Sequence, residues 1–385
     1  MRPFEIKKDI YWVGALDWSE RDFHNFTTPR GLTYNSYLIL DEMITLIDAV
    51  KHKFVEDLVE KVEKLVDLSK IKYIVINHIE PDHASGLSDI LKLAKDAEIV
   101  CSQRAKDGLC KYSDCDGWKI KVVKGGDQLK IGKRTLTFVD MTMLHWPDSM
   151  AVYVEEDKIL FSNDAFGQHI ASEGRFDGDV DDPVYWAKMY YANILMPLSG
   201  LIKKKLEELK NLKIEMIAPS HGIVWKNPSK ILEAYKKWAD FESENKLVIV
   251  YDTMWNSTEM LAKAIADGAG SVGAKVYLFH VRKTSFTEIV TEILDAKAIA
   301  VGSPTLHNSV FPTIAGFLTY LKSLRPQKKK ALAFGSYGWN GVGIKEVHSL
   351  LQEMKLECLE PLMVRYKPKK DEIEKAFNLG VELVK

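Results

Sequence analysis

The stretch that most constrains this chain is a dense set of possible metal ligands directly after a short apolar run. Residues 73–76 read Tyr-Ile-Val-Ile, a pattern typical of a buried strand. His78, Glu80, Asp82 and His83 follow within six residues. A helix is predicted next, because apolar residues recur at helical spacing at Leu87, Ile90, Leu91 and Ala94. The sequence therefore places the ligand set on a loop between a strand and a helix, where a rigid scaffold can aim it.

Two imidazoles and two carboxylates form a hard, oxygen-rich ligand set. Such a set suits iron or manganese at least as well as zinc, which in structural sites prefers thiolate and imidazole. The alternative is a polar loop that is simply solvated, as a single His-x-Glu pair usually is. The density of ligand types after a buried strand favours a metal site.

Further ligand candidates lie downstream, each after a strand-like run. His145 follows residues 142–144, Asp164 follows residues 160–163, and His221 follows residues 216–220. A single histidine at a strand end is more often a packed or surface residue than a ligand. In a chain that already carries a ligand loop, we expect these side chains to complete the metal site.

Composition sets the broad class of protein. A chain of 385 residues predicts two or three domains, and 46% hydrophobic and 28% charged residues are normal for a soluble globular protein. The formal net charge of -1 gives no reason to expect nucleic acid or an anionic membrane as a partner. Residues 1–5 carry no apolar signal region, and no run approaches a membrane span, so a cytoplasmic location is expected.

The cysteines give no sign of a thiolate site. Cys101, Cys110, Cys115 and Cys358 include no Cys-x-x-Cys pair. This pattern argues against a disulfide scaffold, an all-thiolate zinc site and an appended rubredoxin-type iron centre. We expect buried or incidental thiols.

The chain divides into two regions of different character. Residues 1–245 mix strands with helices, including helical segments near 54–66 and 184–209, which indicates sheets covered by helices. Residues 246–385 alternate strictly between strands and helices: the strands are expected at 247–251, 276–280, 298–302, 331–335 and 358–364. This alternation predicts an α/β domain with a doubly wound parallel sheet of the flavodoxin-like order.

Ligands of such a sheet bind beyond the carboxyl ends of its strands. The loop after the first strand offers hydroxyls and backbone N–H groups at a helix N-terminus, which suit a phosphate, although the same hydroxyls can simply cap the helix. The loops after the third and fourth strands carry rings that could flank a planar heterocycle. No Gly-x-Gly-x-x-Gly follows the first strand, so the pattern favours FMN over a dinucleotide. The candidate FMN residues are Thr253, Met254, Trp255, Asn256, Ser257, Thr258, Ser303, Pro304, Thr305, Leu306, His307, Asn308, Ser336, Tyr337, Gly338, Trp339, Asn340 and Gly341.

The order His78-x-Glu80-x-Asp82-His83, followed by His145, Asp164 and His221, resembles the flavodiiron proteins over nearly the whole chain. Zinc hydrolases of the related fold typically have a second histidine where Glu80 stands, and the added carboxylate favours iron. The resemblance implies a metallo-β-lactamase-like αββα sandwich in residues 1–245, followed by a flavodoxin-like FMN domain in residues 246–385.

The resemblance also implies how the ligands divide between two iron ions. One iron would take His78, Glu80 and His145, and the other would take Asp82, His83 and His221. Asp164 would bridge the two. His24 and Tyr191 are candidate catalytic groups near the open face of the site.

The activity that the resemblance implies is reduction of O2 to water, with NO reduction to N2O as a further or main activity. FMN carries two electrons and two ferrous ions supply one each, which together match the demand of O2. The donor would be external, either rubredoxin or a reduced deazaflavin. A head-to-tail homodimer, or a dimer of such dimers, would bring the flavin of one subunit to the metals of the other.

Two other classes of function stay open from the residues. One is a dinuclear metallohydrolase with an appended flavodoxin domain, against which Glu80 argues. The other is a flavodoxin-like electron carrier with a structural metal domain, against which the full ligand set and the scarcity of cysteine argue.

Overall fold

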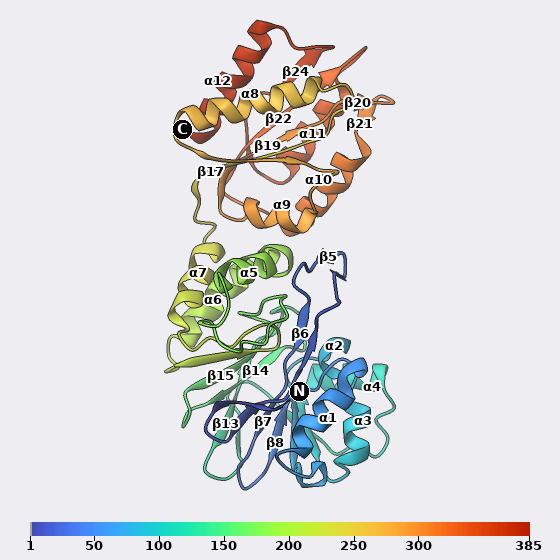
Figure 1. The fold of residues 1–385 in the computed structure, drawn as a ribbon, viewed down its shortest axis with the longest axis vertical. Coiled ribbons are helices and arrows are strands. Elements are labelled where there is room, and N and C mark those ends of the chain that lie inside the picture. The colour runs from blue at the N-terminus through green and yellow to red at the C-terminus, as the bar shows by residue number, and fades with distance from the viewer. Residues whose placement is uncertain (1) are drawn as a thin grey trace. The chain divides into compact units, whose positions relative to one another are not determined.

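The computed structural model describes residues 2–385, which form two compact units. The first unit comprises residues 1–190 and 200–236, of which residue 1 is not described, and the second comprises residues 191–199 and 237–385. The expected αββα sandwich and flavodoxin-like sheet are confirmed (Figure 1). The domain boundary expected at residues 245 and 246 stays a prediction.

The first unit is built on two mixed sheets. The larger sheet runs in the order β1 (Phe4–Lys7), β2 (Ile10–Trp12), β7 (Tyr37–Ile39), β8 (Thr45–Ile47), β9 (Tyr73–Ile76), β10 (Glu98–Ser102) and β11 (Ile120–Val123). The second sheet runs in the order β12 (Gln128–Lys130), β13 (Thr135–Asp140), β14 (Met150–Val154), β15 (Ile159–Asn163) and β16 (Met216–Pro219). Within the larger sheet, β7 and β8 form an antiparallel pair.

Each face of the larger sheet buries an apolar layer. One layer joins alternate strand residues such as Ile47 and Val75 to Phe138 and Phe161 of the second sheet. The other layer joins residues such as Leu46 and Ile74 to the helices outside. Period-two alternation along the strands thus sends neighbouring side chains into different layers. The helices of the outer layer are α1 (Val55–Glu63), α2 (Pro81–Ala84), α3 (Leu87–Leu93) and α4 (Gln103–Tyr112).

Short elements complete the first unit. Small ribbons pair β3 (Ala15–Asp17) with β6 (Leu32–Tyr34) and β4 (Asp22–Phe23) with β5 (Phe26–Thr27). The helix α6 (Ser199–Leu209) and most of α7 (Ser229–Ala239) lie on the side of the second sheet (Figure 1). The helical segment expected near residues 184–209 is present. It divides into α5 (Pro183–Tyr190), a π turn (Tyr191–Leu195), a 3-10 turn (Met196–Leu198) and α6, because Pro197 cannot continue the α-helical bonding pattern.

The second unit is a parallel sheet with the strand order β18-β17-β19-β22, followed at the edge by β23 and β24. The strands are β17 (Glu244–Tyr251), β18 (Lys275–His280), β19 (Ala296–Gly302), β22 (Lys330–Tyr337), β23 (Glu357–Cys358) and β24 (Leu362–Arg365). The helices are α8 (Ser257–Ser271), α9 (Phe286–Ile293), α10 (Pro312–Leu324), α11 (Val342–Glu353) and α12 (Lys370–Val384). A small hairpin of β20 (Thr305–Leu306) and β21 (Ser309–Val310) extends the third loop.

The last strand of this sheet departs from the sequence expectation. One strand was expected over residues 358–364, but β23 and β24 pair with β22 separately. Pro361 lies between them and has no N–H to donate to the ladder, which accounts for the interruption. The carboxyl ends of β17, β19, β22 and β24 still point the same way, so their loops share one edge.

The cysteine expectation is wrong for one pair. Cys110 at the end of α4 and Cys115 form a disulfide with a Cα–Cα distance of 5.3 Å. The chain bends back after α4 ends at Tyr112, which brings these two residues to a spacing that suits a disulfide. Cys101 and Cys358 are free.

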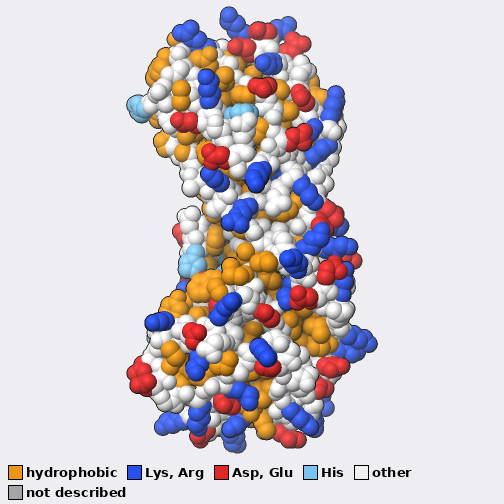
Figure 2. Space-filling view, turned by 180° about the vertical axis from the view of Figure 1, so that it is seen from behind, with side chains coloured by type: hydrophobic (Ala, Val, Ile, Leu, Met, Phe, Trp, Pro, Cys, Tyr) orange, Lys and Arg blue, Asp and Glu red, His pale blue; other side chains and the backbone are white. Residues whose placement is uncertain are grey.

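The surface carries mixed charge. Figure 2 shows Lys and Arg interspersed with Asp and Glu over the face in view, in keeping with the formal net charge of -1. Among residues 2–385, no helix combines the length and apolar character that a membrane crossing requires.

Candidate metal centre and flavin cavity

The predicted ligands converge from both sheets of the first unit. His78, Glu80, Asp82 and His83 follow β9, with α2 beginning at Pro81. Asp164 follows β15 directly and His221 follows β16. His145 lies in the loop between β13 and β14 rather than at a strand end, because β13 ends at Asp140. All of the predicted ligand residues lie in two neighbouring groups.

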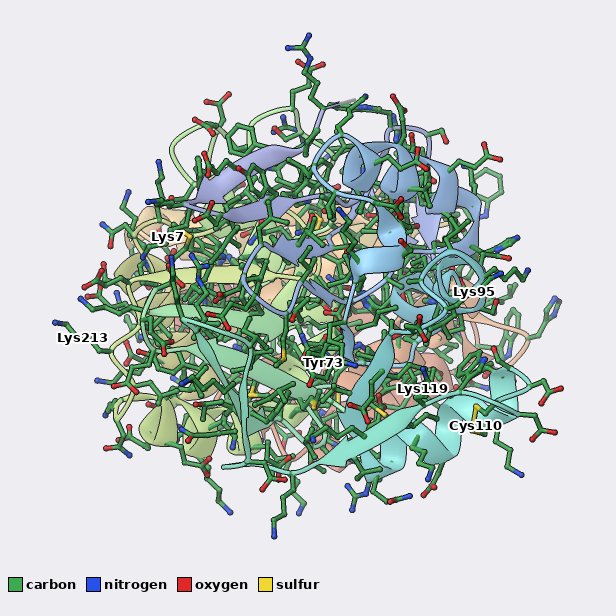
Figure 3. The ribbon with its side chains drawn as sticks, turned by 90° about the horizontal axis from the view of Figure 1, so that it is seen from below. Lys7, Tyr73, Lys95, Cys110, Lys119 and Lys213 are labelled. Atoms are coloured by element: carbon green, nitrogen blue, oxygen red, sulfur yellow. A yellow bond between two sulfur atoms is a disulfide. The ribbon has the colours of Figure 1, made fainter. Side chains whose placement is uncertain are left out.

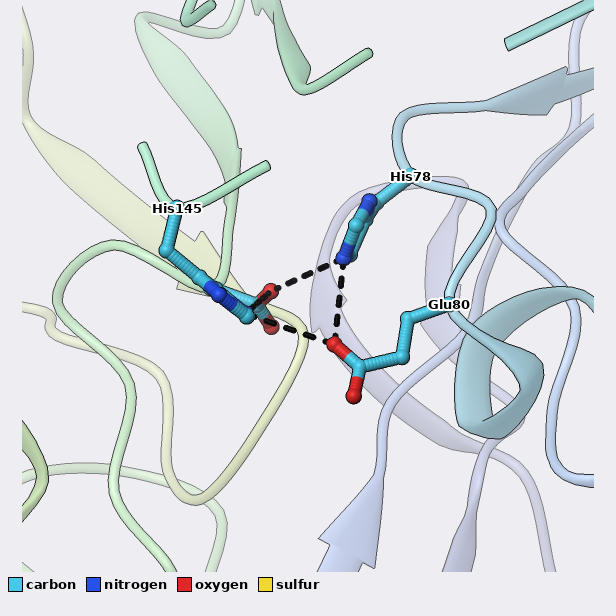
Figure 4. A group of neighbouring side chains, drawn as sticks. His78, Glu80 and His145 are labelled. Carbon is cyan, nitrogen blue, oxygen red and sulfur yellow. Dashed lines mark hydrogen bonds and ion pairs between the residues drawn. The ribbon is translucent and has the colours of Figure 1, made fainter. Parts of the chain in front are cut away.

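The first group contains His78, Glu80, His145 and Asp164. The Nε2 of His78 lies 3.3 Å from Oε2 of Glu80, and the Nε2 of His145 lies 3.4 Å from the same oxygen. Figure 4 shows the two imidazole rings and the Glu80 carboxylate pointing toward one another. The facing nitrogen and oxygen atoms enclose a position where one cation could be held.

The second group contains Asp82, His83 and His221. The Nε2 of His221 lies 3.2 Å from Oδ2 of Asp82, and the Nε2 of His83 lies 3.5 Å from it. All three side chains are buried. This group therefore offers a second cation position.

Asp164 stands between the two groups, with one oxygen toward each. Its Oδ2 lies 3.1 Å from Nε2 of His145 and 3.7 Å from Nε2 of His78. Its Oδ1 lies 3.1 Å from Nε2 of His83 and 3.5 Å from Nε2 of His221. This is the arrangement of a carboxylate that bridges two metal ions.

Several buried polar atoms of the site have no hydrogen-bond partner in the part of the protein that the structure describes and are suited to bind cations. Both carboxylate oxygens of Asp82 and of Asp164 are buried without a hydrogen-bond partner, and so are both ring nitrogens of His83. Buried carboxylates without donors are costly unless a cation compensates them. The site therefore fits a pair of hard cations such as iron.

The pKa values of the ligand side chains also indicate a site that binds cations. Burial lowers the pKa of His83, but the carboxylates of Asp82 and Asp164 outweigh it and raise that pKa to about 10. His145 behaves likewise: the close carboxylates of Asp164 and Glu80 raise its pKa to about 10 against burial. Burial raises the pKa of Asp164, yet the neighbouring charges of His83 and His145 hold it well below its usual range. Bound metal ions would replace these protons.

Outer partners orient the ligand rings. The Nδ1 of His78 lies 3.0 Å from Oδ2 of Asp148, which also accepts from the backbone N–H of Ile79 at 2.9 Å. The Nδ1 of His221 lies 2.6 Å from the carbonyl oxygen of Thr33. These contacts leave Nε2 of each ring free to face a metal. Asp148 follows His145 by three residues, but its residue type alone does not indicate this role.

A cavity of about 520 Å³ opens beside the first group. Its lining includes Glu80 and Asp82 together with Phe23, His24, Trp146 and Tyr112. The Nε2 of His24 lies 3.3 Å from Oε1 of Glu80, and the His24 side chain is 63% exposed. The structure thus brings His24 to the mouth of the metal site.

The second unit has a cavity of about 860 Å³ at the carboxyl edge of its sheet. Eleven of the predicted FMN residues line it: Met254, Trp255, Asn256, Ser257, Pro304, Thr305, Leu306, Ser336, Tyr337, Gly338 and Trp339. The volume is within the range of cofactor sites. Asn256, at φ 64°, adopts the left-handed conformation at the start of α8, which Asn tolerates in place of Gly.

Other predicted FMN residues make hydrogen bonds within the loops around the cavity. Thr258 shares a hydrogen bond of 3.0 Å with Ser336, Ser303 donates to the carbonyl oxygen of Pro304 at 2.8 Å, and Asn308 bonds to Asn340. The hydroxyls of Thr253 and Thr305 are buried without a hydrogen-bond partner, as donors awaiting an oxygen-rich ligand would be. His307 and Gly341 do not belong to the lining of this cavity.

Comparison with known proteins identifies the family. Residues 32–222 match the ODP family beta lactamase model, and residues 249–380 match the flavodoxin model. The nitric oxide reductase of Moorella thermoacetica is 46% identical over 389 residues, which cover 98% of this chain and 97% of that protein. The chain belongs to the flavodiiron protein family.

Solved structures agree with this assignment. The rubredoxin oxygen:oxidoreductase of Desulfovibrio gigas has a TM-score of 0.95 at 37% identity, covering 100% of this chain and 98% of that one. The flavodiiron protein of Giardia intestinalis has a TM-score of 0.98 at 35% identity, covering 100% and 96%. This flavodiiron protein is an oxidoreductase with FMN and a non-haem di-iron centre as its cofactors.

Of the two neighbouring tyrosines Tyr190 and Tyr191, the sequence predicted Tyr191 as a catalytic residue of this flavodiiron protein, but Tyr190 lies nearer to the metal ligands. Tyr191 belongs to the second unit, where its hydroxyl shares a hydrogen bond of 2.9 Å with Ser199 and its ring packs on Trp238. Tyr190 is buried in the first unit, with its ring centroid 6.2 Å from that of His221. The tyrosine beside the metal groups is thus the preceding residue, and the helical phase at the end of α5 decides between them.

Four further residues lie beside the metal ligands or line the flavin cavity of this flavodiiron protein but were not predicted from the sequence. His169 is buried with its ring centroid 5.3 Å from that of His221, and burial together with the His221 charge lowers its pKa to about 3. Met260, Tyr366 and Lys367 line the flavin cavity. Tyr366 and Lys367 follow β24, and the rule that ligands bind at the carboxyl ends of strands could have found them.

Proposed function

We propose that this flavodiiron protein reduces O2 to water and also reduces NO to N2O, with electrons that pass from an external donor through FMN to the metal centre. The observation that carries the proposal is Asp164, whose two oxygens face two separate ligand groups. Two adjacent metal ions can hold both atoms of a diatomic substrate at once. FMN and the iron ions supply the electrons when they are bound.

The proposed iron ligands are those expected from the sequence. His78, Glu80 and His145 would hold one iron, and the second group, Asp82, His83 and His221, would hold the other. Asp164 would bridge them. The two carboxylates of the first group, Glu80 and Asp164, support iron over zinc because hard oxygen ligands suit it.

The residues of this chain contribute orientation, proton supply and exclusion of water. Asp148 and the Thr33 carbonyl hold the rings of His78 and His221 in place. His24, which is exposed to solvent and has its Nε2 3.3 Å from Oε1 of Glu80, is placed to pass protons toward the site. Trp146 and Phe23 form apolar parts of the cavity wall and limit the water that reaches the metals.

The electron donor and the assembly are finer parts of the proposal. A rubredoxin or a reduced deazaflavin is the proposed donor, and the Desulfovibrio gigas relative is a rubredoxin oxygen:oxidoreductase. A head-to-tail homodimer, or a dimer of dimers, would place the flavin of one subunit at the metals of another. A cytoplasmic location is part of the same proposal.

Steady-state gas consumption tests the function. The holoenzyme, given reduced rubredoxin, should consume O2 and NO in an electrode chamber, and Asp164→Asn should abolish both activities. Loss of gas reduction in Asp164→Asn with FMN still bound would support the proposal. Undiminished reduction in that variant would refute the assigned centre.

A thioester or lactam hydrolase is the competing reading of the same fold. A zinc-loaded protein that hydrolyses such substrates and consumes neither gas would favour it. Glu80 argues against this reading, since it replaces the nitrogen ligand that the zinc hydrolases typically have.

A further inference from the structure

The helix α4 is attached to the metal loops at its start. Ser102 caps it by accepting from the N–H of Ala105 at 3.0 Å, and the same hydroxyl donates to the carbonyl oxygen of Asp148 at 2.9 Å. Asp148 in turn orients His78. The position of α4 is therefore tied to a ring that is proposed to ligate the metal.

The middle of α4 packs directly on the ligand loop. Gly108 faces Ile79, and a Cβ at this position would collide with the Ile79 side chain. Ile79 stands between His78 and Glu80, so the helix rests on the loop that carries both. The close approach explains why this helix has a glycine in its interior.

The last residue of α4 reaches the mouth of the metal cavity. Tyr112 is 59% exposed and lines the cavity together with Glu80 and Trp146. Among residues 2–385, none makes a hydrogen bond to the Tyr112 hydroxyl. The position of this wall residue thus depends on the backbone that carries it.

The disulfide closes a ring around that backbone. Cys110 and Cys115 are joined on either side of Tyr112, in addition to the N–H of Ser113 that donates to Leu109 at 2.8 Å. Cys110 is exposed and Cys115 is partly exposed. Figure 3 shows Cys110 at the periphery of the molecule. A disulfide with this exposure is open to attack by an external thiolate.

We propose that Cys110 and Cys115 form a reversible thiol–disulfide site that controls access of solutes to the metal centre. In the oxidised form the ring holds Tyr112 in the cavity wall. Reduction frees residues 111–115 and lets Tyr112 move away. The inference rests on the proposed metal centre.

The chemistry is a balanced exchange with a protein dithiol of the thioredoxin type. One thiolate of the dithiol attacks a sulfur of the Cys110–Cys115 bond, and its second thiolate resolves the mixed disulfide. The chain gains two electrons and two protons as two thiols, and the dithiol becomes a disulfide. A low-molecular-weight disulfide reverses the reaction.

The effect depends on the size of the solute. O2 and NO are small enough to pass beside Tyr112 in either state, so gas reduction should change less than twofold. A chelator that must approach the metal ions closely needs a wider opening. The oxidised form should therefore retain its metal ions longer in the presence of chelators.

The test is the rate at which anaerobic holoenzyme loses iron to bipyridyl, with and without prior treatment by a dithiol. Alkylation of the protein after denaturation should count two free thiols without reduction and four after it, since Cys101 and Cys358 are free and four cysteines are present. Reduction should accelerate iron loss about tenfold. Cys110→Ser should lose iron at the faster rate in both conditions.

Two further variants separate the explanations. Tyr112→Ala should release iron quickly whether or not the disulfide is reduced, because the wall is gone. Cys358→Ser, in the second unit, should respond to reduction like the unmodified chain. Equal iron loss from oxidised and reduced protein, or four free thiols before reduction, would overturn the inference. Purified protein without any iron would instead count against the proposed function. In that case the inference is tested by measuring how fast zinc-loaded protein loses zinc to a zinc chelator, before and after reduction.

Discussion

His78 is held from behind by Asp148: the Nδ1 of the ring lies 3.0 Å from Oδ2 of the carboxylate, and both side chains are buried. The same carboxylate fixes the backbone N–H of Ile79. Asp148 thus sets both the tautomer of His78 and the path of the ligand loop. Partners of this kind usually raise the basicity of a metal-binding imidazole.

Asp148→Ala should weaken metal binding without emptying the flavin site. Removal of such a partner typically costs 10–100-fold in metal affinity, and we expect about that loss here. Iron content after dialysis against a chelator measures it. Asp96→Ala, at a side chain that is 88% exposed, is the matched control and should leave the iron content unchanged. Full iron retention in Asp148→Ala would show that His78 needs no support.

Glu80→His should turn the metal preference toward zinc. The change replaces a hard oxygen ligand by an imidazole and restores the pattern typical of zinc hydrolases. After expression in medium with both metals, the ratio of zinc to iron should rise and gas reduction should fall by about tenfold or more. Metal analysis and O2 consumption measure the two effects. An unchanged ratio would mean that Glu80 does not select the metal.

Thr305→Val should weaken FMN binding about 5–10-fold. The hydroxyl of Thr305 is buried without a hydrogen-bond partner and lines the flavin cavity. One hydrogen bond contributes about 1 kcal/mol, which corresponds to that change in Kd. Fluorescence titration of the FMN-depleted protein measures it. Thr319→Val, on the outer face of α10, should bind FMN like the unmodified chain.

Tyr190→Phe should lower turnover, whereas Tyr191→Phe should lower stability. Tyr190 lies beside His221, so its hydroxyl should matter for turnover, with a fall of about threefold or more in kcat. Tyr191→Phe removes the hydrogen bond to Ser199 and should lower the free energy of unfolding by about 1 kcal/mol. Gas consumption and thermal unfolding separate the two. A larger loss of kcat in Tyr191→Phe would restore the role expected from the sequence.

Asp41→Asn should destabilise the first unit at neutral pH but not in acid. Burial raises the pKa of Asp41, but the N–H groups of Lys133, Glu42 and Arg134 and the Arg134 charge outweigh it and lower that pKa. A carboxylate with a lowered folded pKa stabilises the protein above its unfolded pKa, about 3.9, and loses this effect as the pH falls. We expect a difference of about 1–2 kcal/mol at pH 7 that shrinks below about pH 3.9 and is lost as the pH falls through the lowered folded pKa. Denaturant titrations at pH 7 and at successively lower pH measure it, and a constant difference would contradict the cause.

Much of the fold follows from periodicity. The run of residues 73–76 and the spacing of Leu87 and Ile90 led to β9 and α3, and the strict alternation after residue 246 led to the parallel sheet. Three features of the fold leave no trace in the hydrophobic periodicity and were not predicted. The break between α5 and α6, the interruption of the last strand at Pro361 and the Cys110–Cys115 disulfide depend on local geometry.

The candidate site shows the same division. Ligand types with a distinctive order, from His78 to His221, are visible in sequence because their chemistry is rare in that density. Asp148, His169 and Tyr190 are ordinary residue types whose roles depend on which direction a loop or a helix turns. Successive side chains of a helix point about 100° apart, so Tyr190 faces His221 whereas Tyr191 faces Trp238. Only the packed structure shows which of the two tyrosines faces the metal ligands.

The most direct measurement is anaerobic metal and flavin analysis, followed by stopped-flow reoxidation of the fully reduced protein with O2 and, separately, with NO. The proposal predicts two irons and one FMN per chain, with reoxidation by either gas much faster than that of free reduced flavin. Two zinc ions per chain, with reoxidation no faster than that of free flavin, would contradict it and favour the hydrolase.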